Sequence, residues 1–248
     1  MDFNTGRGEG RPDDQSRPLY SERAGGRPVG GPERGPAGGP RGGEFNLQDP
    51  INSFISTVRA LVLDPVGFFR GMARRGGFVT PLIFAVICAL ISALLSGIIN
   101  LILSPLFAGP GDTGEALAEG VVGFVGNLIF TPIFVVIVLF IVAAITHLLV
   151  TLLVRPQNAG FEATFRVGAY IQALGLISWI PIIGPIIAFV WAVVLYVLGL
   201  REVHTTTTGR AALVVLIPLA IVFLLAILFL AVIAAIVGGA IMSESQQF

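Results

Sequence analysis

Charged residues are scarce in this sequence, and lysine is absent. Only 12% of the 248 residues are charged, about half the fraction that is usual in a soluble domain. All 15 basic residues are arginine, and 15 acidic residues balance them. The lack of lysine, together with abundant glycine, alanine, proline and valine, is typical of a GC-rich bacterial genome. The zero net charge gives no indication of a partner, and we expect no binding to nucleic acid.

Cysteine and histidine are also rare. The single cysteine, Cys88, excludes an internal disulfide, and its apolar neighbours predict a small side chain that faces a helix or lipid. Glu202 and His204 have no second histidine, cysteine or carboxylate at the spacing of metal ligands. We therefore predict no metal site and no cofactor.

Apolar residues dominate the rest of the chain. They make up 54% of it, and the mean hydropathy is +0.88. They gather in runs that are too long and too apolar for the helices of a soluble core, which indicates an all-α polytopic membrane protein. We predict five transmembrane helices, at residues 81–103, 132–154, 164–180, 182–200 and 211–238.

The N-terminal region has a different composition. Residues 1–45 contain 12 glycines, 6 prolines and 14 of the 30 charged residues. Such a segment cannot bury enough apolar surface to offset the entropy of ordering. We predict a disordered cytoplasmic tail at 1–47, a membrane domain at 48–240 and a short extracytoplasmic tail at 241–248.

Two short helices are predicted between the tail and the first span. Asp49-Pro50 and Asp64-Pro65 each resemble a helix cap followed by proline at the first helical position, which predicts helices at 50–63 and 65–74. The first has apolar residues at helical spacing and polar residues on its other face. These helices either lie in the membrane interface or pack on the spans, and both can hold at once.

Two of the spans leave alternatives open. The apolar run 121–154 is too long for one upright span, so Thr131-Pro132 is interpreted as a helix start, with an amphipathic helix before it. The alternative is one tilted helix kinked at the proline. Residues 167–200 are interpreted as a helical hairpin with a tight turn at 179–185, and a re-entrant hairpin would leave the flanking loops on the same side.

Arginines near the span ends define an orientation. They lie before the first span, between the second and third spans, and between the fourth and fifth spans. The other segments outside the membrane have no basic residue. The positive-inside rule therefore predicts a cytoplasmic N-terminus and an extracytoplasmic C-terminus. We expect these arginines to face lipid phosphates or a partner; they are Arg70, Arg74, Arg75, Arg155, Arg166, Arg201 and Arg210.

No acidic or basic residue lies inside the predicted spans, except for Arg166 near the start of the third. This pattern argues against an ion-coupled transporter. Ser96 and His147 are at depths of roughly 23 Å and 10 Å from the cytoplasmic side, so they cannot form a serine protease pair, and we predict no catalytic residues. His147 and Gln172 both lie in the cytoplasmic half of adjacent spans. We expect them to share a polar patch, unless each bonds its own helix or water.

Four segments together resemble a known family. "LDPVGFFRGM" (63–72), "TPLIF" (80–84), "GAYIQALGLISWIPIIGPIIAFVW" (168–191) and "LGLREVHTTTTGRAAL" (198–213) are similar to the bacterial branch of the Yip family of Rab/Ypt-interacting multi-pass membrane proteins. The resemblance covers about residues 48–238. It implies five helices and a cytosolic N-terminus. Eukaryotic members are associated with Rab GTPases and vesicle traffic, which bacteria lack, so the resemblance implies an integral membrane protein of unassigned role.

These observations predict a non-enzymatic scaffold or adaptor of the bacterial inner membrane. Its cytoplasmic face would bind anionic lipid or a protein partner, and self-association is left open. The alternative is a passive permease or lipid-translocating protein with a polar groove near His147 and Gln172. A polar groove open to both sides would favour the alternative, and a sealed bundle with a basic rim would favour the adaptor.

Overall fold

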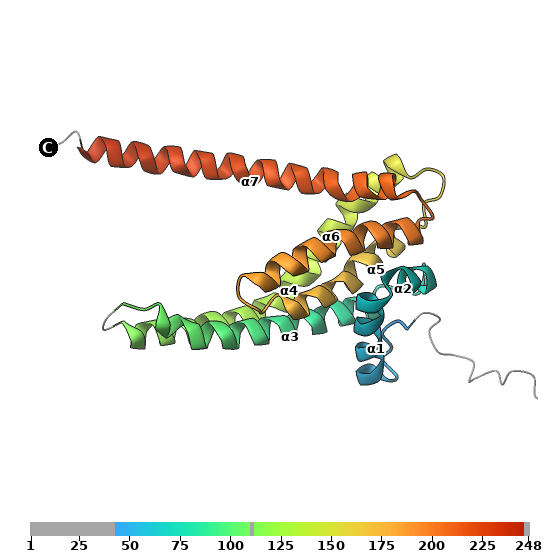
Figure 1. Ribbon diagram of the computed structural model, residues 1–248, viewed down its shortest axis with the longest axis horizontal. Coiled ribbons are helices and arrows are strands. Elements are labelled where there is room, and N and C mark those ends of the chain that lie inside the picture. Colours follow the sequence, from blue (N-terminus) through green and yellow to red (C-terminus); the bar gives the residue numbers. More distant parts are fainter. Residues whose placement is uncertain (1–42, 110–111, 246–248) are drawn as a thin grey trace, which may run out of the picture. The chain divides into compact units, whose positions relative to one another are not determined.

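A computed structural model describes residues 43–109 and 112–245 of the chain. Most of the predicted disordered tail, 1–42, lies outside the described residues, as do 246–248. The described part contains only helices and connecting segments (Figure 1). In order they are α1 (Pro50–Leu63), α2 (Pro65–Gly71), α3 (Val79–Leu103), η1 (Ser104–Leu106), α4 (Thr113–Leu153), α5 (Phe161–Ile171), η2 (Gln172–Ile177), α6 (Ile183–Val203) and α7 (Thr208–Ser245).

Four helices are long and apolar enough to cross a membrane. They are α3 extended through Leu106, α4, α6, and α7 as far as Val237. Over the described residues the protein is therefore all-helical, and it is a multi-pass integral membrane protein. The predicted third span, 164–180, is divided between α5 and η2, which have 11 and 6 residues. Residues 241–245, predicted as part of a tail, continue α7.

The predicted helix start at Thr131-Pro132 is wrong. α4 runs without a break for 41 residues, and Pro132 lies inside it. A proline is tolerated inside a membrane helix because neighbouring groups can satisfy the backbone carbonyl that its missing N–H leaves unpaired. At ~1.5 Å per residue, α4 is about twice as long as a ~30 Å hydrocarbon core is thick. The single long helix that was the alternative interpretation is therefore the one observed.

The two short N-terminal helices are confirmed. The Asp64 carboxylate accepts a hydrogen bond of 2.9 Å from the backbone N–H of Gly67, so it caps α2 as its position before a proline predicts. Phe68 and Phe69 of α2 are buried against the spans. On α1, by contrast, Ile51 and Leu63 are 72% and 69% exposed. Figure 1 shows α1 running across the direction of α3.

A close approach of α2, α5 and α6 depends on Gly199. A Cβ at this position would lie 2.6 Å from Val167 Cγ1 and 3.1 Å from the Phe69 ring. We expect Gly199→Ala to lower the free energy of unfolding by about 1–3 kcal/mol, because the three elements must separate to admit the methyl group. Thermal unfolding in detergent measures this.

The matched control is Gly123→Ala in α4. Both glycines lie inside a helix, so both changes gain the same helix propensity, roughly 1 kcal/mol. A Cβ at Gly123 would meet nothing within 4 Å. Equal melting temperatures for the two variants would contradict a packing role for Gly199.

The hairpin turn predicted at 179–185 is observed. The N–H of Gly184 donates to the carbonyl of Ile180 at 2.9 Å, and α6 begins at Ile183. A Cβ on Gly184 would lie 2.3 Å from the Ile177 carbonyl oxygen, so only glycine permits this approach. The turn brings the start of α6 against the end of η2, and the two arms of the hairpin run antiparallel.

Candidate functional site

Six of the seven predicted arginines lie at one end of the bundle, on or beside the loops that join α2 to α3, α4 to α5 and α6 to α7. All are exposed except Arg201, which is half-buried. Glu202 holds two of them, with Arg70 Nε at 3.1 Å and Arg201 Nη2 at 2.6 Å from its carboxylate. We call this set the arginine rim: Arg70, Arg74, Arg75, Arg155, Arg201 and Arg210.

Arg166 does not belong to this surface, and its predicted contact with lipid or a partner is wrong. Its side chain is buried, with 3% of the residue exposed. Its Nη2 atom donates to Glu44 Oε2 at 2.6 Å, and its Nη1 atom donates to the Gly77 carbonyl at 3.0 Å. A buried guanidinium requires a counter-charge and hydrogen-bond acceptors, and here the protein itself supplies both.

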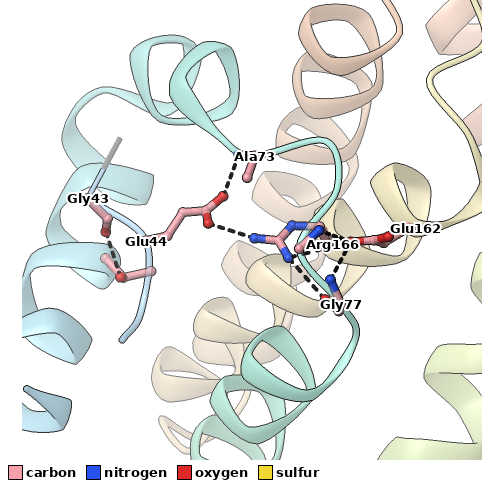
Figure 2. A network of polar contacts seen from close by, with 8 residues as sticks. Gly43, Glu44, Ala73, Gly77, Glu162 and Arg166 are labelled. Atoms are coloured by element: carbon pink, nitrogen blue, oxygen red, sulfur yellow. Dashed lines mark hydrogen bonds and ion pairs between the residues drawn. The ribbon is translucent and has the colours of Figure 1, made fainter. Parts of the chain in front are cut away.

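The counter-charge comes from a segment that was predicted to be disordered. Glu44 is buried, and its Oε1 atom accepts a 2.8 Å hydrogen bond from the Ala73 N–H (Figure 2). The Gly43 carbonyl accepts a hydrogen bond from Thr57 Oγ1 at 2.8 Å. Phe45 is buried, with its ring centre 5.7 Å from that of Phe84. The predicted tail boundary at 47 is therefore too late, since the packed structure already includes Gly43.

The loop before α3 completes this polar network. Glu162 Oε1 accepts hydrogen bonds from the backbone N–H groups of Gly76 and Gly77 (Figure 2). The same carboxylate lies 3.9 Å from Arg166. Burial raises the pKa of the Glu44 carboxyl above its ordinary value, and the Arg166 guanidinium opposes that rise. The network ties the N-terminal segment, the loop and α5 to one another.

A second polar chain links three helices near the arginine rim. The backbone N–H of Ala159 donates to His204 Nδ1 at 3.0 Å. Neutral His204 must therefore carry its hydrogen on Nε2, which donates to Thr164 Oγ1 at 3.1 Å. Thr164 Oγ1 also forms a hydrogen bond of 3.0 Å with His147 Nδ1. This chain joins the ends of α4 and α6 to α5.

His204 is fully buried at the end of α6. Burial, together with smaller contributions from charge repulsion by His147 and Arg74, lowers its pKa to about 4. The imidazole is therefore neutral at physiological pH and acts as a fixed hydrogen-bonding bridge. The predicted spans at 182–200 and 211–238 leave His204 in a connecting loop, and its sequence neighbours give no sign of this role.

The structure does not bring His147 and Gln172 together. Among the described residues, the hydrogen-bond partner of His147 is Thr164, which lies eight residues before Gln172, roughly 12 Å along a helix. Gln172 instead lines two cavities. One of about 420 Å³ lies between α4, α5, α6 and α7, and the other of about 510 Å³ lies between α3, α4 and η2. The predicted patch is two separate polar features.

The order of the elements matches the segments that carried the family resemblance. Two short helices precede the first span, a glycine turn closes the α5–α6 hairpin, and His204 follows the hairpin. A sequence model of the Yip1 domain matches residues 59–242. The chain belongs to the Yip1 domain family. Comparisons with curated proteins and with solved structures found no match.

Part of the polar network lies outside the matched region of this Yip1 domain. Glu44 and Phe45 precede residue 59, whereas Arg166 lies well inside the matched residues. The domain therefore contains a buried arginine whose nearer counter-charge, Glu44, belongs to the chain that precedes the domain. Over the described residues, the Yip1 domain has no cluster of three or more histidine, cysteine or acidic side chains that could hold a metal ion.

Proposed function

We propose that this Yip1 domain protein is a non-enzymatic scaffold or adaptor of the bacterial inner membrane. Its cytoplasmic face, formed by the arginine rim and α1, binds anionic lipid or an acidic protein partner. The observation that carries this proposal is the position of six arginines at one end of the bundle. Arginine forms charge-assisted, bidentate hydrogen bonds to phosphate and carboxylate groups.

The exposed face of α1 supports this assignment. Phe54 and Val58 pack against the spans, while Ile51, Ile55 and Val62 of the same helix remain exposed. Arg59 lies beside this apolar edge, where the helix has a groove of about 420 Å³. A helix with an exposed apolar edge and an adjacent cation is suited to the membrane interface. In this arrangement α1 lies in the plane of the cytoplasmic leaflet.

Five spans, rather than four, fit the α5–α6 hairpin best. α5 and η2 together rise about 28 Å, close to the ~30 Å thickness of the hydrocarbon core. Their two ends lie level with the ends of α6, because Ile177 approaches Gly184 and Thr164 bonds His204. If α6 crosses the membrane, α5–η2 crosses it too. Five spans with the arginine rim inside put the C-terminus outside.

The alternative function is a passive permease or lipid-translocating protein. The observation in its favour is that the two cavities meet at Gln172. On the side of the arginine rim, however, Val150, Leu200 and Val214 form a cluster that is no more than 1% exposed. A closed apolar layer at this end argues against a continuous pathway and supports the adaptor function. Flux of fluorescent lipid or small solutes through liposomes that contain the folded protein would favour the alternative.

Anionic-lipid binding is tested by neutralising the four rim arginines that Glu202 does not pair with. We expect replacement of Arg74, Arg75, Arg155 and Arg210 by glutamine to reduce the phosphatidylglycerol that stays bound after partial delipidation. The effect should be about fivefold or more, since each surface cation contributes ~1 kcal/mol to attraction by anionic lipid and the loss of a single such contribution already changes binding about fivefold. Native mass spectrometry from mixed phosphatidylglycerol and phosphatidylcholine nanodiscs measures the ratio.

The control variant carries Glu115→Gln and Glu119→Gln, which remove exposed charges in the first turns of α4. It should keep the wild-type lipid ratio. Unchanged phosphatidylglycerol binding in the arginine variant would reject lipid as the ligand of the rim. A protein partner would then be the remaining form of the proposal.

A further inference from the structure

We propose that the two cavities at Gln172 form one binding site for a neutral lipid inside the membrane. The apolar chain of the lipid lies in the cavity beside α7, and its uncharged, oxygen-bearing head points toward the cavity beside α3. This inference goes beyond the scaffold function and rests only on the proposed five-span arrangement.

The cavity beside α7 suits an apolar chain. Sixteen residues line it, and only Thr146, Gln172 and Tyr196 among them have polar side chains. Two of these side chains are already hydrogen-bonded to each other, because the Tyr196 hydroxyl donates to Thr146 Oγ1 at 3.1 Å. Its volume of about 420 Å³ falls in the range of small-molecule sites, roughly 300–1,000 Å³.

The cavity beside α3 has a different chemistry. Its walls include Ser92, Ser96, Asn127 and Thr131. Thr131 Oγ1 donates to Asn127 Oδ1 at 2.9 Å, which leaves the amide hydrogens of Asn127 and the oxygen of Thr131 free to bond a ligand. Hydroxyl or ester groups match this lining, and an acyl chain alone does not.

Gln172 lies at the boundary between the two cavities. It lines both of them, and among the described residues its side-chain amide has no hydrogen-bond partner. An amide in apolar surroundings is costly unless it is paired. A ligand whose polar group lies between the two compartments would pair it.

The route of access restricts the ligand to molecules dissolved in the membrane. The cluster around Val150 and Leu200 closes the cytoplasmic end. The apolar cavity opens sideways, where its lining residues Val142, Phe189 and Val222 are 40%, 55% and 63% exposed. Gln172 lies roughly 17 Å from the start of α5, close to the middle of the bilayer. A charged headgroup is expensive at that depth, so the ligand is neutral.

Photolabelling tests the site. Full-length protein in nanodiscs is labelled with diacylglycerol that carries a diazirine halfway along one acyl chain, and separately with phosphatidylcholine that carries the same chain. We expect the diacylglycerol probe to label peptides that line the cavities on α4, α6 and η2. The phosphatidylcholine probe should label mainly the exposed outer face of α7.

Three variants distinguish a site from surrounding lipid. Ala192→Phe fills the apolar cavity and should reduce diacylglycerol labelling there roughly tenfold, whereas Ala220→Phe on the exposed face of α7 should not. Gln172→Leu should reduce it about fivefold, the effect of one lost hydrogen bond. If Ala192→Phe fails to fold, Val142→Trp blocks the cavity mouth instead.

The outcomes decide the proposal. Cavity labelling that falls with Ala192→Phe and with Gln172→Leu, but not with Ala220→Phe, supports it. Equal labelling by the two probes, or labelling that none of the variants changes, means that ordinary surrounding lipid fills the cavities, and it overturns the proposal.

Discussion

Glu44→Gln is expected to lower the free energy of unfolding by about 2–3 kcal/mol, because it removes the nearer of the two carboxylates beside the buried Arg166 guanidinium and leaves only Glu162, at 3.9 Å. The loss is large because Arg166 is only 3% exposed and, among the described residues, its Nε atom has no hydrogen-bond partner. The glutamine side-chain oxygen can still accept the hydrogen bond from the Ala73 N–H. The change therefore removes the charge at this position and keeps the size of the side chain. Denaturant titration in detergent micelles measures the difference.

The control is Glu115→Gln, at an exposed position in the first turn of α4. It should change the free energy of unfolding by less than about 0.5 kcal/mol. The double variant Glu44→Leu with Arg166→Met should be more stable than Glu44→Leu alone and close to wild type. The reason is that a buried ion pair can be replaced by apolar groups at little cost. A Glu44→Gln variant as stable as the control would mean that the N-terminal segment does not hold this site.

The second large effect is a loss of stability on acidification that depends on His204. The folded pKa is about 4, against an ordinary value of 6.5. Between these values the unfolded chain binds a proton that the folded protein excludes. Stability is therefore fully present above pH 6.5 and falls as the pH drops toward 4. The fall is on the order of 3 kcal/mol for this one group.

The hydrogen bond that protonation would break is the one between Ala159 and His204. A proton on His204 Nδ1 would face the Ala159 N–H, which now donates to that atom. Thermal unfolding measured from pH 7.5 to pH 4 should give a steeper fall for wild type than for His204→Asn. The asparagine Oδ1 can accept the same hydrogen bond but does not titrate. Because both proteins share every other titrating group, parallel pH curves would exclude His204 as the cause.

The local signals in the sequence predicted the helices well but not their lengths. Asp64-Pro65 predicted the start of α2, because a cap and a proline act within one turn. Thr131-Pro132 has the same pattern, yet α4 passes through it. A proline stops a helix only where the freed carbonyl has no other partner and a bend cannot be accommodated. Both conditions depend on neighbouring helices and lipid, which the local pattern does not contain.

The candidate site was predicted in part. Surface arginines near the ends of apolar runs were identified from their positions alone, because charged groups are excluded from the hydrocarbon layer. Arg166 met the same criterion and is nevertheless buried. Its partner Glu44 is 122 residues away in the sequence, within a region whose composition is typical of disorder. Composition is an average over a window, so it cannot detect a single carboxylate and aromatic pair that fills a specific pocket.

By itself, the sequence determined that this is a multi-pass helical membrane protein with arginines concentrated at one side. Long apolar runs and the exclusion of charge from hydrocarbon are properties of consecutive residues, and they need no knowledge of contacts. Only the tertiary structure decided which polar groups meet: Glu44 with Arg166, His204 with Thr164, and Gln172 with two cavities. Those pairings depend on how helices far apart in the sequence pack, since the free energy of a buried polar group is set by the partner that it finds there.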